Sequence, residues 1–305
     1  MFGVALTTAS CLRARTRVDV VWLVDGHGLG TFDPADAMAL TPGGGRFGSL
    51  LGGALAGHLA DLATRTSSQV RLVDLEVAEV DAAIAGLSGP GRVTAVVAPA
   101  DQLPESLWRL LLERTAVCLI GNIDNGAIGP FSIYLGDEID AAGSDVADRF
   151  RRGISGTVVE SHEGAHRLVT ILIPVDRFVI AGQGPIADAL SAAAVLQGWQ
   201  VLRAADVDTA TGLMVDLTPA DMVVVMGHDV ELSSRMLAGA LASNAGYIGA
   251  LGSSRMQEQR ANWLAYRGIT DVDRVNGPAG LAIGAATPAE IAVSILAQVI
   301  AVRNL

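Results

Sequence analysis

Residues 177–196 read RFVIAGQGPIADALSAAAVL, and this stretch decides the fold of the second half of the chain. Its first five residues form a short apolar run that predicts a strand. The glycine cluster Gly182-Gln183-Gly184-Pro185 follows, and residues 186–196 then carry apolar side chains at helical spacing. A strand, a glycine-rich turn and a helix in this order predict the start of a βαβ unit.

The same alternation continues to the end of the chain. The run DMVVVM at 221–226 is typical of a central parallel strand that is covered on both faces. Thr287, Pro288 and Glu290 supply the N-cap, N1 and N3 residues of a last helix. We also expect strands over 199–202 and 245–251 and helices over 230–241 and 256–266. The prediction for residues 175–305 is a Rossmann-like, doubly wound parallel sheet.

The first half predicts a mixed α/β domain over residues 1–174. Its expected strands lie at 18–24, 70–75, 93–98 and 116–121, its helices at 54–64 and 103–114, and a hairpin at 154–173. The apolar start, residues 1–11, predicts a buried strand or helix. It does not have the order of a signal peptide, because its arginines follow the apolar stretch. The boundary between the two domains is expected near 174–177.

The composition of the 305-residue chain excludes several classes of chemistry. The net charge is −11 and all 21 basic residues are arginine, so a Schiff-base lysine and a P-loop lysine are absent. The acidic balance argues against nucleic-acid and anionic-membrane partners. Two cysteines, Cys11 and Cys118, fit a reducing cytoplasmic setting. No apolar stretch is long enough to predict a membrane span.

The candidate ligand site lies at the carboxyl ends of the predicted parallel strands, where open α/β sheets bind their ligands. Three loops meet there, and each has a purely structural alternative: the glycines pack a helix on a strand, Asp229 caps a helix, and His228 is packed. A phosphate is bound at such a place by a helix N-terminus and by arginine. The candidate residues are Gly182, Gly184, Ala187, His228, Asp229, Gly252, Ser253 and Arg255.

A nicotinamide cofactor is a further reading of the pattern Gly182-x-Gly184-x-x-Ala187. The acidic residue that binds the ribose belongs at the end of the second strand. Arg203 and Ala205 occupy that end and Asp206 comes later, which argues against tight NAD binding. Arg203 is either a contact to a 2′-phosphate or a surface arginine.

The stretch His162-Glu163-Gly164-Ala165-His166 matches the zinc motif H-E-x-x-H in letters only. A zincin requires this pattern on a helix, and the flanking residues here are β-formers. We therefore expect a hairpin tip and no zinc site.

A glycine-dense segment, TPGGGRFGSLLGG at 41–53, precedes the first long helix. Such a loop either arranges backbone N–H groups around an anion or forms an ordinary hairpin.

Several stretches resemble the XdhC/CoxI family, the maturation factors of xanthine dehydrogenase and carbon monoxide dehydrogenase. VVVMGHD (223–229), YIGALGSSR (247–255) and the whole of 277–303 resemble its C-terminal domain, and PVDRFVIAGQG (174–184) resembles the start of that domain. GSLLGG (48–53) resembles its N-terminal glycine loop.

The resemblance implies an accessory protein that binds molybdenum cofactor (molybdopterin) and assists its insertion into a molybdoenzyme. The sequence contains no evident nucleophile–base pair or metal cluster, so we expect a binding protein rather than an enzyme. The resemblance also implies a homodimer, a molybdoenzyme client and a cysteine desulfurase as partners. It adds Ser49, Gly52 and Gly53 to the cofactor-binding candidates. Ala54 stands where the family has the cysteine suspected of touching the cofactor. Other polar family positions are also replaced, at Ala56, Pro185, Ala205, Ser254, Met256 and Ala282.

Three functions therefore remain open. The first is the maturation factor. The second is a divergent paralogue that has lost the cofactor and acts as a structural or regulatory partner. The third is an NAD(P)-dependent oxidoreductase.

Overall fold

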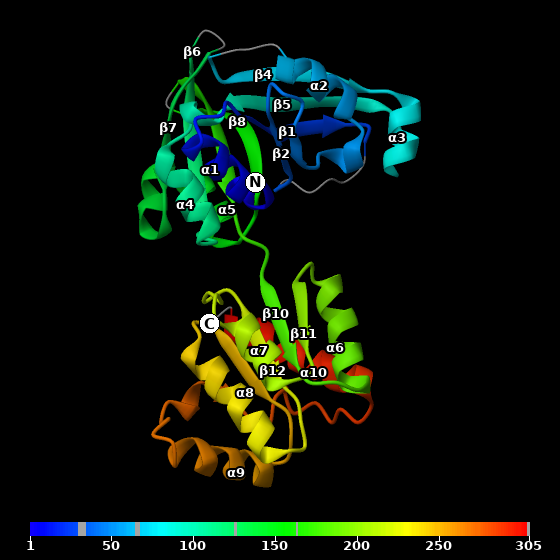
Figure 1. The fold of residues 1–305 in the computed structure, drawn as a ribbon, viewed down its shortest axis with the longest axis vertical. Coiled ribbons are helices and arrows are strands. Elements are labelled where there is room, and N and C mark those ends of the chain that lie inside the picture. The colour runs from blue at the N-terminus through cyan, green and yellow to red at the C-terminus, as the bar shows by residue number, and fades with distance from the viewer. Residues whose placement is uncertain (30–34, 65–67, 125–126, 163, 304–305) are drawn as a thin grey trace. The chain divides into compact units, whose positions relative to one another are not determined.

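The computed structural model describes residues 1–29, 35–64, 68–124, 127–162 and 164–303 (Figure 1). The chain divides into two compact units, Met1–Pro174 and Val175–Leu305. Within the described residues, every helix is too short or too polar to cross a membrane.

The N-terminal unit contains two antiparallel sheets, with strand orders β3-β2-β1-β5-β4 and β7-β6-β9-β8. The first sheet consists of β1 (Asp19–His27), β2 (Ala37–Leu40), β3 (Arg46–Gly48), β4 (Arg71–Val77) and β5 (Gly91–Pro99). The second consists of β6 (Val117–Asp124), β7 (Ala127–Tyr134), β8 (Gly156–His162) and β9 (Ala165–Leu172).

Helices cover these sheets. They are η1 (Phe2–Val4), α1 (Ala5–Arg13), η2 (Leu51–Gly53), α2 (Ala56–Thr64), α3 (Glu79–Ala85), η3 (Ala100–Gln102), α4 (Glu105–Leu112), η4 (Gly136–Ala142) and α5 (Ser144–Arg151). The mixed α/β prediction for this half is confirmed. The prediction omitted β2, β3, β7, α3 and α5, which are short or contain glycine and proline.

Both faces of the central strand β1 are buried over its first five residues, which explains its apolar run. Val20 and Trp22 of β1 pack with Leu119 of β6 and with α1 and α4 in a shared core. Val21 and Leu23, on the other face of β1, pack against α2 and α3. The Trp22 indole donates to Thr170 Oγ1 of β9 at 3.2 Å, which ties the two sheets together.

The C-terminal unit contains one parallel sheet in the order β11-β10-β12-β13-β14. Its strands are β10 (Arg177–Ala181), β11 (Gln200–Ala204), β12 (Met222–Val225), β13 (Tyr247–Ala250) and β14 (Val275–Asn276). Its helices are α6 (Pro185–Leu196), α7 (Val207–Met214), α8 (Val230–Ala242), α9 (Ser254–Ala265), η5 (Val272–Arg274) and α10 (Pro288–Arg303). The Rossmann-like prediction is confirmed.

Helices cover both faces of this sheet (Figure 1). Helices α7, α8 and α9 bury Val179, Val223 and Ile248 on one face. Helices α6 and α10 bury Phe178 and Val224 on the other. The last helix begins with a capping box: Glu290 Oε2 accepts the N–H of Thr287 at 2.9 Å, and Thr287 Oγ1 accepts the N–H of Glu290 at 3.3 Å.

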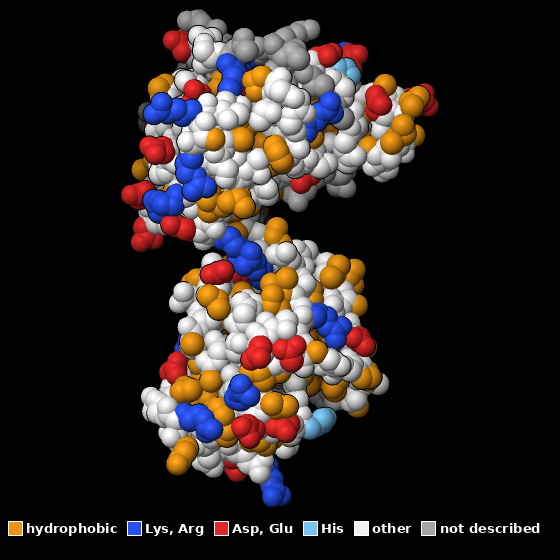
Figure 2. Space-filling model, viewed as in Figure 1, with side chains coloured by type: hydrophobic (Ala, Val, Ile, Leu, Met, Phe, Trp, Pro, Cys, Tyr) orange, Lys and Arg blue, Asp and Glu red, His pale blue; other side chains and the backbone are white. Residues whose placement is uncertain are grey.

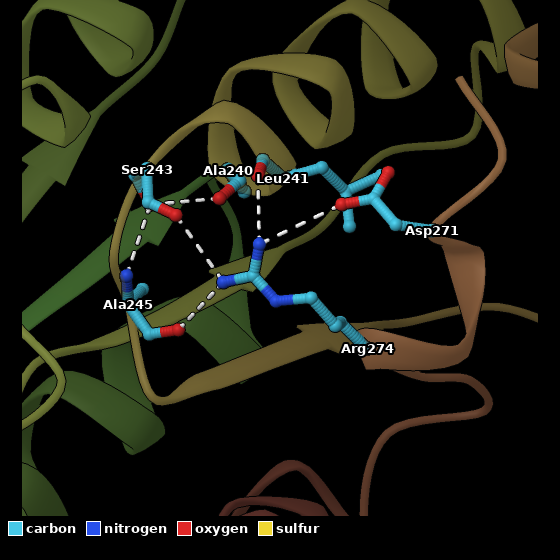
Figure 3. Close-up of polar contacts among 6 residues, drawn as sticks. All are labelled: Ala240, Leu241, Ser243, Ala245, Asp271 and Arg274. Atoms are coloured by element: carbon cyan, nitrogen blue, oxygen red, sulfur yellow. Dashed lines mark hydrogen bonds and ion pairs between the residues drawn. The ribbon is translucent and has the colours of Figure 1, made fainter. Parts of the chain in front are cut away.

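Arg274 connects the end of α8 to the start of β13 (Figure 3). Its Nη1 donates to Leu241 O at 2.8 Å, and its Nη2 donates to Ser243 O at 3.2 Å and Ala245 O at 3.0 Å. The last carbonyls of a helix have no partner within the helix, and the guanidinium fork supplies one here. This contact fixes where β13 begins.

Charges of both signs are mixed on the face of the molecule seen in Figure 2. On this face, arginine side chains lie among acidic ones and do not form a continuous basic strip of the kind that follows a phosphate backbone.

We expect Arg274→Ala to lower the free energy of unfolding by about 1–3 kcal/mol, because three carbonyls lose a charged donor. Arg274→Lys will recover only part of the loss, since one ammonium cannot form the fork. Urea denaturation measures both. Arg235→Ala, an exposed arginine of α8, is the control and should change stability by less than about 0.5 kcal/mol. Equal effects at both positions would contradict the role given to Arg274.

Candidate functional site

The carboxyl ends of three parallel strands meet at one edge of the C-terminal sheet. Ala181 of β10 pairs with Val225 of β12, and Val225 pairs with Ala250 of β13, so the three strands end at the same level. The chain reverses its direction across the sheet between β10 and β12. In doubly wound sheets this switch point is where a ligand binds.

A cavity of about 310 Å³ opens at this edge. We call it the switch-point cavity. Its walls come from the loops after β10, β12 and β13 and are mainly apolar, being formed by Gln183, Pro185, Ile186, Met226, Gly227, His228, Leu251, Gly252 and Met256. The volume lies at the lower end of the range for small-molecule sites.

Glycines let these loops approach one another. A Cβ on Gly182 would lie 2.6 Å from Met226 O, and a Cβ on Gly252 would lie 2.6 Å from Met256 Sδ. Both residues also have positive φ, +146° and +129°. Gly184 has φ +104° and open space beside it, so it makes the turn into α6. Ala187 is fully buried and packs α6 on the sheet.

Helix N-termini at this edge differ in how they are capped. Asp229 Oδ1 accepts the N–H of Leu232 at 2.9 Å and caps α8, and Ser253 Oγ accepts the N–H of Met256 at 3.4 Å and caps α9. Helix α6 has no side-chain cap and has Pro185 in its first turn. Its N-terminus therefore keeps free N–H groups and the positive end of its dipole for an anion.

His228 and Arg255 are exposed side chains of the segments that follow β12 and β13. His228 is exposed and lines the cavity, so the alternative that it is packed is wrong. Arg255 is exposed at the start of α9, and its guanidinium makes no hydrogen bond or ion pair with the described part of the chain. Both side chains are free to contact a ligand.

Arg260 holds the floor of this edge, and no sequence pattern indicated this role. Arg260 is 1 % exposed as a residue, and its guanidinium donates to Gly227 O at 2.8 Å, to Leu251 O at 2.5 Å and to Ser233 Oγ at 2.9 Å. A fourth bond reaches Gln257 Oε1 at 3.3 Å. Burial lowers the pKa of the guanidinium. All four acceptors are neutral, so within the described residues this buried cation has no carboxylate partner.

The N-terminal candidates lie in the other unit. The segment 41–53 forms the β2–β3 hairpin turn and then η2, which matches the hairpin alternative for its first part. Ser49 and Gly53 are exposed. Gly52 packs closely, because a Cβ there would lie 2.9 Å from Ala85 O. Ala54 is only 7 % exposed and points into the core under α2.

The letters H-E-x-x-H fall on a hairpin and not on a helix. His162 ends β8 and His166 lies in β9, while Glu163 lies outside the described residues. His162 pairs with Ala165, as expected for a tight hairpin tip. Among the described residues, no group of three or more His, Cys, Asp or Glu side chains is placed to hold a metal ion.

The side chains at the end of β11, the second strand of the parallel sheet, have local partners and are not available to a dinucleotide. Arg203 pairs with Asp188 of α6, with Nη1 and Oδ1 2.6 Å apart, so it is a surface arginine with a local partner. Asp206 caps α7 by accepting the N–H of Thr209 at 2.9 Å. Hydrogen bonds from Thr209 lower the pKa of the Asp206 carboxyl.

Comparisons with known proteins match the C-terminal unit to a protein family model. Residues 178–299 match the family model described as the XdhC Rossmann domain. A solved structure described as a xanthine dehydrogenase from Bacillus halodurans covers 98 % of this chain and 95 % of its own, with 21 % identity and a TM-score of 0.50. At that identity the match shows the fold. No curated protein sequence matches this chain.

We expect Arg260→Met to lower the free energy of unfolding by about 2–4 kcal/mol, because two strand-end carbonyls and Ser233 lose a charged donor. Urea denaturation followed by circular dichroism measures this. Arg255→Met, on the same helix but exposed, is the matched control and should leave stability unchanged. A neutral or stabilising Arg260→Met would show that desolvation of the cation outweighs its hydrogen bonds.

We expect Cys118 to be inert toward thiol reagents in the native protein. Burial raises the pKa of its thiol to about 12, and only the thiolate reacts. Cys11 is half-buried and should react first. Titration with Ellman's reagent at pH 8, native and denatured, measures this. Because the folded pKa exceeds the unfolded value, Cys118 also makes stability fall as pH rises above about 9. Rapid native labelling of Cys118 would contradict its burial.

Proposed function

With residues 178–299 forming an XdhC Rossmann domain, we propose that this chain is an accessory protein that holds molybdopterin in the switch-point cavity and assists its insertion into a xanthine dehydrogenase- or carbon monoxide dehydrogenase-type enzyme. The molybdoenzyme is the client, and molybdopterin is cargo. A cysteine desulfurase and a second copy of this chain are further partners in this proposal.

One observation carries the proposal: an apolar cavity at the switch point lies beside a helix N-terminus that has no side-chain cap. Molybdopterin combines a flat ring system with a phosphate. The ring fits between apolar walls that include Ile186, Met226 and Met256. The phosphate fits the N-terminus of α6, where backbone N–H groups and the helix dipole favour an anion. The residues present therefore suit this cargo.

The remaining residues of the edge have separate tasks. Gly182 and Gly252 let the loops of the cavity pack closely. Any side chain at these two positions would collide with Met226 or Met256. His228 and Arg255 supply an imidazole and a guanidinium to the polar end of the cargo. Arg260, below the floor, holds the carbonyls of Gly227 and Leu251 in place. The bound cargo supplies the molybdenum chemistry of the client.

A second candidate function rests on Ala54. The family resemblance puts a cofactor-contacting cysteine at this position, and here the side chain is a methyl group buried in the core. A chain that has lost this contact would bind its client without cargo, as a structural or regulatory partner. This candidate predicts client binding that is independent of molybdopterin.

Calorimetry and thermal unfolding with molybdopterin, its nucleotide derivatives and NADPH test the proposal. A ligand at 100 times its Kd should stabilise the native state by about 2.7 kcal/mol. We expect this from molybdopterin or its nucleotide and not from NADPH. Ile186→Trp, which fills the cavity, should abolish binding. Arg255→Ala should weaken it about tenfold, a loss of about 1.4 kcal/mol.

Arg235→Ala is the control for the charge removed in Arg255→Ala, and Ser49→Ala tests the N-terminal loop. Stabilisation by NADPH alone would favour the oxidoreductase. No stabilisation by any ligand, with client binding retained, would replace the proposal by the cofactor-free partner.

A further inference from the structure

A cavity lies in the N-terminal unit, on one face of the sheet β7-β6-β9-β8. Its volume is about 740 Å³, and its polar lining residues include Asn122, Ser132, Tyr134, His162 and Arg167. We call it the sheet cavity. Neither the Rossmann domain nor the function proposed above uses it.

Strand pairing places these side chains on one face. Arg167 pairs with Asn122 of β6 on one side and with Glu160 of β8 on the other. Paired residues of an antiparallel sheet point to the same face. Ser132 and Tyr134 join that face because they pair with Ile120 and Cys118, the alternate residues before Asn122. The deeper part of the face is core under η4 and α5, and the polar part continues beyond it.

Arg167 is the central donor of the cavity. Its side chain is 9 % exposed, and its Nε and Nη2 donate to Glu160 Oε1 at 2.8 and 2.6 Å. Nη2 also donates to Ala142 O at 2.6 Å. The third nitrogen, Nη1, makes no hydrogen bond with the described residues, although the residue lines the cavity. A guanidinium fixed on one edge presents its remaining N–H groups in a set direction.

His162 stands beside this guanidinium. A Cβ on Gly143 would lie 3.4 Å from His162 Cε1 and 3.4 Å from Arg167 Nη2, so both side chains lie against the same point of the backbone. Gly143 has φ +105°, which a side chain would strain. The imidazole of His162 makes no hydrogen bond with the part of the chain described. The His162 ring and the Arg167 guanidinium therefore share one end of the cavity.

We propose that the sheet cavity binds a small aromatic molecule that carries an oxyanion, either a carboxylate or a phosphate. The oxyanion accepts from Arg167 Nη1 and from the His162 ring. Asn122, Ser132 and Tyr134 supply further hydrogen bonds, and the Tyr134 ring and Ile120 contact the flat part of the ligand. Asp124 also lines the cavity. Recognition therefore depends on directed donors and not on net positive charge.

Phenyl phosphate and benzoate, which share a ring and differ in the anion, are the probes. Each is titrated into the full chain while the imidazole resonances of the histidines are followed by NMR, and calorimetry gives Kd. We expect saturable shifts of the His162 ring with at least one probe, and the tighter probe identifies the anion. His162→Gln and Tyr134→Phe should each raise Kd about tenfold, the scale of one hydrogen bond to a charged group.

Two controls test whether the probes bind in the sheet cavity. His27→Gln, at an exposed histidine of β1, should leave Kd unchanged. Ile186→Trp, which fills the switch-point cavity, should also leave it unchanged. Absence of a His162 shift with both probes would overturn the proposal. So would a Kd that is lost in Ile186→Trp but kept in His162→Gln and Tyr134→Phe, because the probes would then occupy the other unit.

Discussion

The buried guanidinium of Arg260 is the constraint on which the C-terminal site depends. It reaches from α9 to the carbonyls that follow β12 and β13 and to Ser233 of α8. Those carbonyls stand where the parallel ladder has ended, so no neighbouring strand satisfies them. A single planar cation supplies all the missing donors and fixes the spacing of two loops that form the switch-point cavity. Arg260 therefore fixes the geometry of the switch-point cavity, although it does not line the cavity.

Among the described residues of this lysine-free chain, Arg274, Arg260 and Arg167 share this structural role. Arg274 holds the end of α8, Arg260 holds the strand ends, and Arg167 holds Glu160 and the carbonyl of Ala142. In each case a rigid fork joins acceptors from separate elements, which a flexible ammonium does less well. The three differ in their counter-charge. Arg167 has Glu160 and Arg274 has Asp271 at 3.7 Å, whereas all the acceptors of Arg260 are neutral.

The sequence predicted those features that depend on neighbouring residues. The β-branched run at 222–225 and the glycine turn after Ala181 indicate a parallel sheet by local pattern, and the Thr287–Glu290 capping box is local as well. Arg260 could not be found in this way, because an arginine on a mainly polar helix has the pattern of a solvated face. The sheet cavity was not predicted for a related reason: Asn122 and Arg167 lie 45 positions apart in the sequence and meet only through strand pairing. Helix α7 was missed because its short sequence contains threonine and glycine, which are weak helix formers.

Under the proposed function, the replaced polar positions change how the switch-point cavity would recognise its cargo. Pro185 stands first in α6 and Met256 lines the cavity, where the resemblance places a histidine and a basic residue. Neither side chain can donate a hydrogen bond. Selectivity for the cargo would therefore depend on the shape of the cavity, on backbone N–H groups and on His228 and Arg255. The unneutralised charge of Arg260 adds a preference for anions, because a low-dielectric floor screens it weakly. A site of this kind distinguishes a flat anion from a neutral ring more sharply than it distinguishes one flat anion from another.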